Sequence, residues 1–149
     1  MVVKQDVINL FDNIQEQDLE ECFAASGLKD KNAVMEAEYN AFQTLEYAEP
    51  IYRDGKLCAI VGFKKLFIDE HEAMAIIVLT TKEIVKRKFD YFRQAIKLVN
   101  KAKKVCSKLL FCTLSSYKEA LSMNKRLGFK HYKDIEINGR KFEIDMLGV

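Results

Sequence analysis

Stretches of continuous hydrophobicity and of periodic hydrophobicity alternate along the second half of the chain. Residues Ala73–Leu79 form an uninterrupted apolar run, which predicts a strand covered on both faces and therefore central in a sheet. A long helical pattern separates this run from the apolar segment Leu109–Leu114. Because such a connection brings the chain back in the same direction, we expect two parallel neighbours joined by a right-handed crossover.

A short helix and a hairpin are predicted at the end of the chain. Ser116–Glu119 has the pattern of a capping box, and Gly128 can end the helix in a left-handed conformation. Apolar residues then alternate on both sides of Asn138-Gly139, a dipeptide typical of tight hairpin turns. The chain is therefore expected to close on two antiparallel strands.

The first half of the chain predicts one strand and two helices. Val2–Leu10 shows some alternation of apolar and polar residues, which is compatible with a strand. Asn13 can cap a helix that runs to about Ala25 and ends at Ser26-Gly27. A second amphipathic helix is expected to begin near Asn32, where apolar residues recur every three or four positions.

Two further antiparallel strands are predicted on either side of Asp54-Gly55. This dipeptide tolerates the positive φ angles that a tight hairpin turn requires. The strands are expected to cover Tyr47–Arg53 and Lys56–Phe67.

The segment after the central strand predicts a basic amphipathic helix. Thr80–Glu83 has the pattern of a capping box, so the helix should begin at about Thr81. Its apolar residues form one stripe that should pack on the sheet. These residues are Val85, Phe89, Phe92, Ile96 and Val99. The basic arc beside this stripe is either an anion-binding face or a set of solvated side chains. The arc consists of Lys86, Arg93, Lys97 and Lys104.

The composition is that of one globular domain, which we expect to span residues 1–149. The chain has 149 residues, 49% of them hydrophobic, which is enough to bury a single core. The longest apolar run is far too short to span a membrane, so we expect a soluble, cytoplasmic protein. The four cysteines are widely separated and accompanied by only two histidines, so we expect reduced thiols and no metal site.

The charge is distributed unevenly, although the formal net charge is only +2. Residues 1–50 contain three lysines and eleven acidic residues, whereas residues 82–108 contain ten basic and two acidic residues. Such a split suits an anionic ligand, nucleic acid, or two faces that attract each other. Nucleic acid is the least favoured, because only Tyr91 and Phe92 interleave the basic residues and no binding motif is present.

The order of the expected elements resembles that of the GNAT superfamily of acyl-CoA-dependent N-acyltransferases. Ala120 together with Lys125–Phe129 resembles the end of the family's last helix. Val78–Ile84, before a helix that bears Phe and Arg, resembles a narrower group, the GNAT-like proteins encoded by tailed bacteriophages. The resemblance implies an α+β sandwich. Its sheet would be mixed and mainly antiparallel, with about seven strands, helices on both faces and one parallel strand pair in the middle.

Two departures from the family pattern concern the residues that would bind and process acyl-CoA. GNAT enzymes usually have a glycine-containing loop after the central strand, whose amides bind the CoA pyrophosphate. The corresponding segment Thr80–Lys88 has no glycine, although it supplies positive charge. Many GNAT enzymes also have a general-acid tyrosine four residues before the Gly-Phe of the last helix, where this chain has Asn124.

The resemblance also implies where ligands would bind. The pantetheine arm of acetyl-CoA, or of another acyl-CoA, would lie between the two parallel strands and pair with main-chain groups of the first. The residues implied for the co-substrate are Ile77, Val78, Leu79, Thr80, Thr81, Lys82, Lys86, Arg87 and Tyr117, the last at a position where the family often has Asn. The residues implied for catalysis are Glu70, Glu72 or His71 as the base, and Asn124. The alternative for the first three is a polar turn between strands, and for Asn124 and Tyr117 it is an ordinary helix position facing the sheet.

Two functions from different classes therefore remain open. The first is an N-acyltransferase that moves an acetyl or similar group from acyl-CoA to an amine. The second is a catalytically inactive GNAT-fold protein with a structural or assembly role in a phage particle, where its partners would be other virion proteins. The missing glycines and the tyrosine replaced by Asn124 favour the second, whereas the intact element order and the basic helix start favour the first. We favour the acyltransferase narrowly, because a helix N-terminus that retains cations can still bind phosphate.

Overall fold

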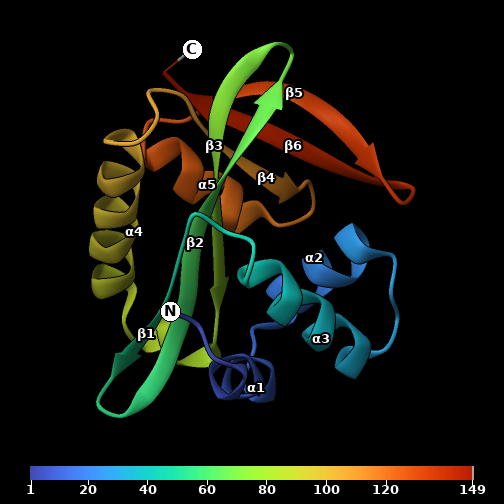
Figure 1. Cartoon of the computed structure of the whole chain (residues 1–149), viewed down its shortest axis with the longest axis vertical. Coiled ribbons are helices and arrows are strands. Elements are labelled where there is room, and N and C mark those ends of the chain that lie inside the picture. The colour runs from blue at the N-terminus through green and yellow to red at the C-terminus, as the bar shows by residue number, and fades with distance from the viewer. Residues whose placement is uncertain (149) are drawn as a thin grey trace.

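The computed structural model describes residues 1–148, which form one six-stranded sheet with helices on both faces (Figure 1). The strand order is β1-β2-β3-β4-β6-β5. The strands are β1 (Tyr47–Arg53), β2 (Lys56–Ile68), β3 (His71–Thr80), β4 (Leu109–Leu114), β5 (Lys130–Ile137) and β6 (Arg140–Leu147). The helices are α1 (Lys4–Asp12), α2 (Glu16–Ser26), α3 (Lys31–Phe42), the 3-10 helix η1 (Lys82–Lys86), α4 (Lys88–Lys103) and α5 (Lys118–Arg126).

The parallel strand pair in the middle of the sheet is confirmed, and all other strand pairs are antiparallel. The expected α+β architecture is therefore present, with six strands among residues 1–148 where about seven were expected. The difference lies at the N-terminus, where Val2–Leu10 was expected to be a strand and α1 forms instead. Val7, Leu10 and Phe11 are buried, and their spacing of three and one residues fits one face of a helix.

The start of α2 also differs from the sequence prediction. Asn13 does not cap it, because α2 begins at Glu16 and the preceding segment is tied to the end of β3. The Asn13 carbonyl accepts from the Lys82 amide at 2.9 Å, and the Gln15 amide donates to the Thr80 carbonyl at 3.1 Å. The predicted end of α2 is confirmed, since Gly27 is left-handed there, with φ of 73°.

The predicted capping box at Thr80–Glu83 is absent. The Thr80 hydroxyl donates to Asp18 and so does not cap a helix, and the chain forms the short helix η1 before α4 begins at Lys88. This break changes the phase of α4, so only Val99 of the predicted stripe is buried against the sheet. Val85 and Phe89 are 55% and 85% exposed. The buried residues of α4 are Ala95, Leu98, Val99 and Ala102.

The α5 helix likewise starts without the predicted capping box at Ser116–Glu119. Its N-terminal flanking residue is Tyr117, which makes no side-chain cap. Gly128 follows the helix with φ of 94°, a conformation that other residues rarely adopt.

The two faces of the sheet pack against different helices. Ile60 and Leu79 belong to a core cluster with residues of α1, α2 and α3. Val61, Met74 and Ile76 point to the other face and pack with α4. This alternation explains why β2 and β3 are apolar on both sides.

The parallel strands β3 and β4 separate soon after they pair. Their pairing consists of Met74 with Leu109 and Ala75 with Leu110. Beyond these pairs β3 continues to Thr80, while β4 pairs with β6 along its other edge as far as Leu114. The sheet therefore opens between the C-terminal ends of its two central strands.

Candidate active site

The opening between β3 and β4 exposes backbone polar groups of β3. The Met74 amide donates to the Lys108 carbonyl at 2.9 Å, on the side of β3 that faces β4. Because backbone groups along a strand alternate in direction, those of Ile76 and Val78 point to the same side. Val78 lies beyond the last residue pair between β3 and β4, so its backbone groups point into the opening.

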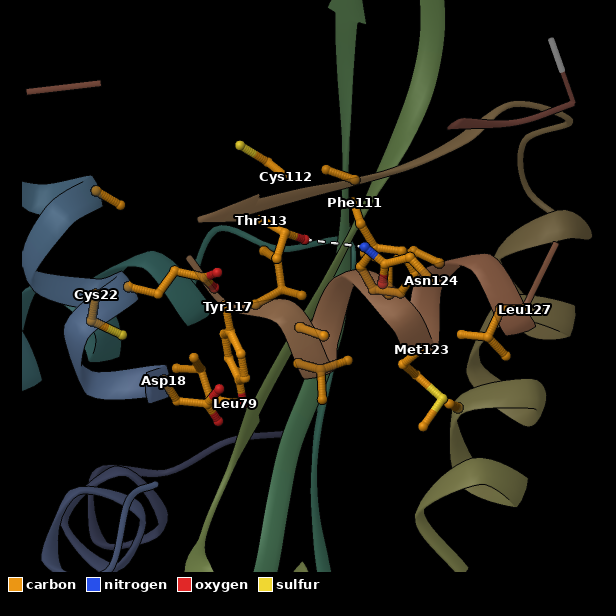
Figure 2. A pocket seen from close by; sticks show the side chains of 18 of the residues that line it. Asp18, Cys22, Leu79, Phe111, Cys112, Thr113, Tyr117, Met123, Asn124 and Leu127 are labelled. Atoms are coloured by element: carbon orange, nitrogen blue, oxygen red, sulfur yellow. Dashed lines mark hydrogen bonds between the residues drawn. The ribbon is translucent and has the colours of Figure 1, made fainter. Parts of the chain in front are cut away.

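A cavity of about 260 Å³ occupies this opening, slightly below the range of roughly 300–1,000 Å³ for ligand pockets. Its walls are Ala75–Leu79 of β3, Phe111–Thr113 of β4, and residues of α2, α3, α4 and α5. Figure 2 shows Asp18 and Cys22 on one side of the cavity and Met123 and Leu127 on the other. The sequence-predicted co-substrate residues Ile77, Val78, Leu79 and Tyr117 line this cavity.

Three carboxylates from α2 and α3 lie at one side of the cavity. They are Asp18, Glu21 and Glu38. Asp18 is only 3% exposed, and its Oδ2 accepts from the Thr80 amide at 2.6 Å and from the Thr80 hydroxyl. Burial raises the pKa of Asp18, and the bonds from Thr80 oppose this shift. Burial likewise raises the pKa of Glu38.

Glu21 is the carboxylate whose protonation changes near neutral pH. Burial raises its pKa to about 7, helped by the negative charges of Asp18 and Glu38 and opposed by a bond from the Leu114 amide. That amide donates to Glu21 Oε2 at 2.9 Å and holds the side chain at the cavity wall. A carboxylate with this pKa exchanges a proton readily at neutral pH, as a general base must.

Neutral polar side chains complete the cavity. Burial raises the pKa of Tyr117, and the nearby Asp18 charge adds to the shift, so the phenol stays protonated. Asn124 is 3% exposed, and its Nδ2 donates to Thr113 Oγ1 and to Asp145 Oδ2, each at 3.1 Å. These bonds fix Asn124 between α5 and the sheet. Burial also raises the pKa of the Cys22 thiol, which makes it a poor nucleophile.

The backbone after β3 differs from a glycine-rich phosphate loop. The Thr81 amide donates to the Cys58 carbonyl and the Thr81 hydroxyl to the Leu57 carbonyl, at 3.0 and 2.6 Å. The Thr80 amide and hydroxyl both bond to Asp18. The amides and hydroxyls of these two residues are therefore engaged within the protein.

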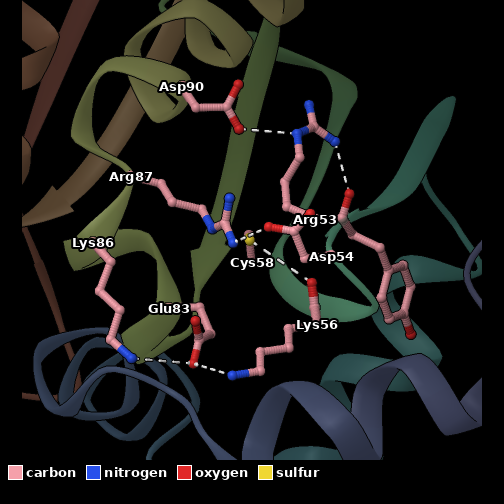
Figure 3. Close-up of polar contacts among 9 residues, drawn as sticks. Arg53, Asp54, Lys56, Cys58, Glu83, Lys86, Arg87 and Asp90 are labelled. Carbon is pink, nitrogen blue, oxygen red and sulfur yellow. Dashed lines mark hydrogen bonds and ion pairs between the residues drawn. The ribbon is translucent and has the colours of Figure 1, made fainter.

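Ion pairs surround the cations at the start of α4 (Figure 3). Lys86 and Lys56 each lie 3.8 Å from Glu83 Oε1. Arg87 Nη2 donates to Asp54 Oδ2 at 2.7 Å, which raises the pKa of Arg87. Lys82 is exposed and lies at the edge of a separate shallow pocket.

The residues that sequence reasoning selected as possible bases lie outside the cavity walls. Glu70 is in the β2–β3 turn with φ of 69°. Glu72 pairs with Lys65 at 3.2 Å, and His71 Nδ1 is 2.8 Å from Lys108 Nζ. The acidic residues of α2 were missed. The sequence contained a signal for them, because Glu21 and Cys22 follow Asp18 by three and four residues. The two acids therefore share a helix face with a buried cysteine.

No family model matches the sequence, and no curated protein sequence matches it. Solved structures do match. A ribosomal-protein-alanine N-acetyltransferase from Brucella melitensis superposes with a TM-score of 0.67 at 10% identity, covering 98% of this chain and 96% of that one.

Two further solved structures match as well. A GNAT-family acetyltransferase from Bacillus anthracis gives a TM-score of 0.70 at 8% identity, covering 97% and 90% of the two chains. The protein yncA from Salmonella typhimurium, solved with its cofactor acetyl-CoA, gives a TM-score of 0.67 at 14% identity, covering 98% and 90%. The protein therefore has the fold of the GNAT acetyltransferases.

Proposed function

We propose that this protein transfers an acyl group from acyl-CoA to the amine of an acceptor. The observation that carries the proposal is the cavity between the separated strands β3 and β4, which has a carboxylate of pKa about 7 in its wall. A matching structure with acetyl-CoA supports the choice of co-substrate. We further propose that the protein works in the cytoplasm.

In the proposed complex the pantetheine arm lies along β3. Its amides pair with backbone groups of Ile76 and Val78, and the side chains of Ile77 and Leu79 help to form the cavity wall. Lys82, Lys86 and Arg87 attract the phosphates of CoA. The ion pairs of Lys86 and Arg87 would first have to rearrange, because Glu83 and Asp54 compete for the same cations.

Glu21 acts as the general base in this mechanism. It takes a proton from the acceptor ammonium, and the free amine attacks the thioester carbonyl. The new carbon–nitrogen bond forms as the carbon–sulfur bond breaks. The proton held by Glu21 returns to the thiolate sulfur directly or through water, and the second proton that the attacking nitrogen loses passes to water. The protonated Tyr117 hydroxyl and the Asn124 amide orient groups in the cavity. We propose Glu21 in place of Glu70, His71 and Glu72, because those three do not line the cavity.

The activity test is an assay of free thiol released from acetyl-CoA in the presence of a panel of primary amines. Glu21→Gln should lower turnover by about 10²–10⁴-fold, which is typical for loss of a positioned base. Glu20→Gln is the matched control, because Glu20 is exposed and pairs with Arg140 at 3.0 Å. Equal activity of the Glu21 and Glu20 variants would contradict the assignment of the base.

The second candidate function is a GNAT-fold protein without catalysis, such as an assembly protein of a phage particle. The observation that favours it is the 3-10 helix η1, whose flanking cations are already paired with Glu83 and Asp54. Thiol release that stays at the background rate with every amine, together with no binding of CoA, would select this candidate.

A further inference from the structure

Four side chains with metal-binding groups meet on one face of the β5–β6 hairpin. They are His131 and Asp134 on β5 and Glu143 and Asp145 on β6. Residues three apart on a regular strand, such as His131 and Asp134, would face opposite sides, so their positions depend on a β-bulge. In the register of the two strands His131 lies opposite Asp145 and Asp134 lies opposite Glu143, and the register shifts between His131 and Lys133. The extra residue, Tyr132, brings His131 and Asp134 to the same face as the two acids on β6.

The donor atoms of three of these residues are close enough to share one ion. His131 Nδ1 lies 3.4 Å from Glu143 Oε1 and 3.6 Å from Asp145 Oδ1. One ligand atom from each residue falls within 4.8 Å of the other two. Ligand atoms around a tetrahedral zinc ion at bond lengths of about 2.0–2.1 Å are roughly 3.3 Å apart. The three donors therefore need only small side-chain movements to coordinate zinc.

The buried carboxylate of Asp145 supplies an independent argument. Asp145 is 2% exposed, and its Oδ2 accepts from Asn124. Its Oδ1 lies 3.6 Å from His131 Nδ1, so the other oxygen of the same buried carboxylate belongs to the group of donors. Burying a carboxylate costs free energy unless it is paired, and a bound cation would reduce that cost.

The surroundings of the donors are those of a metal site. Asp134 Oδ1 lies 3.3 Å from His131 Nε2, so the carboxylate can hold the proton on Nε2 and leave the lone pair on Nδ1. Asn124 holds the Asp145 carboxylate in place. A carboxylate behind the histidine and a hydrogen bond to the ligating acid are the usual supports of bound metals.

We propose that His131, Glu143 and Asp145 bind a divalent transition-metal ion, with Zn²⁺ as the preferred ion and water as a fourth ligand. An imidazole with two carboxylates suits zinc, whereas Mg²⁺ and Ca²⁺ favour oxygen ligands alone. The ion joins β5 to β6 and, through Asn124, both strands to α5. The site does not depend on acyl transfer, because none of its three ligands lines the cavity.

The test is calorimetric titration of the full, tag-free chain with ZnCl₂, alongside thermal unfolding with and without the metal. The wild type should bind one equivalent of Zn²⁺ at micromolar concentration and unfold at a higher temperature. His131→Ala and Glu143→Gln should abolish both effects. Asp134→Asn should weaken binding about 10- to 100-fold, as expected when the group behind a metal-bound histidine is lost. His71→Ala is the matched control and should bind as the wild type does.

Three outcomes would overturn the proposal. One is the absence of saturable Zn²⁺ binding. Another is binding that His131→Ala and Glu143→Gln leave unchanged in variants with native circular dichroism. The third is a thiolate charge-transfer band on Co²⁺ titration, which would assign binding to the free cysteines.

Discussion

Glu21 carries most of the proposed chemistry, and its surroundings explain why a common surface residue type can do so. The carboxylate is withdrawn from water at the cavity wall, close to the charges of Asp18 and Glu38. One amide, from Leu114, bonds to it. Burial and like charges raise the pKa more strongly than one hydrogen bond lowers it, which places its proton exchange at physiological pH.

The raised pKa of Glu21 predicts how stability depends on pH. The folded protein binds this proton with a pKa of about 7, whereas the ordinary pKa of a glutamate, which the unfolded chain retains, is 4.5. The folded state therefore holds more protons between these values, and the free energy of unfolding falls as pH rises across this window. Because a tenfold change in proton affinity corresponds to about 1.4 kcal/mol, we expect a loss on the order of 1–3 kcal/mol.

Urea denaturation at several pH values between 5 and 8 measures this dependence. Glu21→Gln should flatten the curve, and Asp18 and Glu38, whose pKa values are also raised, account for the slope that remains. A stability that rises with pH in both proteins would show that the pKa of Glu21 is not raised.

At the scale of elements, α4 shows where a helical pattern misleads. Val85 to Val99 have the spacing of a single amphipathic helix, but η1 occupies the first turn and α4 begins only at Lys88. The phase of a helix is set by its packing partners, and the sheet accepts the Ala95, Leu98 and Ala102 face. The short side chains of Ala95 and Ala102 made this face look weaker than the Phe-rich stripe. Similarly, α1 was missed because alternation over a short segment fits both a strand and a helix.

The observed phase of α4 predicts opposite results for two large-to-small substitutions. Leu98 is 5% exposed, so Leu98→Ala should lower the free energy of unfolding by about 2–5 kcal/mol. Phe89 is 85% exposed, so Phe89→Ala should change it by less than about 0.5 kcal/mol. Chemical denaturation of both variants measures the difference. A larger loss for Phe89→Ala would favour the phase that the sequence pattern suggested.

For the whole molecule, the order of most elements along the chain and the central parallel pair could be predicted from the sequence, whereas the place of β6 between β4 and β5 could not. The parallel pair follows from the continuous apolar run Ala73–Leu79 and from the helical pattern that separates it from Leu109–Leu114. The cavity could not be predicted, because it depends on where the β3–β4 pairing stops and on how α2 packs. The spacing of Asp18 and Glu21 from Cys22 places the three on one helix face, but only the fold shows that this face lies beside β3 and β4. None of the helices among residues 1–148 is long and apolar enough to cross a membrane.

Filling the cavity tests whether it is the acyl-CoA site. Ala95 lies in the cavity wall and is 6% exposed, whereas its neighbour Ile96 is 38% exposed. Ala95→Phe should occupy the space meant for the pantetheine arm, and Ile96→Phe adds an aromatic ring on the outer side of the same helix. Thermal unfolding of both variants verifies that they are folded before binding is compared.

Isothermal titration with acetyl-CoA tests the central claim most directly. We predict micromolar binding to the wild type and to Ile96→Phe, and loss of binding in Ala95→Phe. The absence of binding to the wild type at millimolar acetyl-CoA, or equal binding to Ala95→Phe, would contradict the assignment of this cavity as an acyl-CoA site.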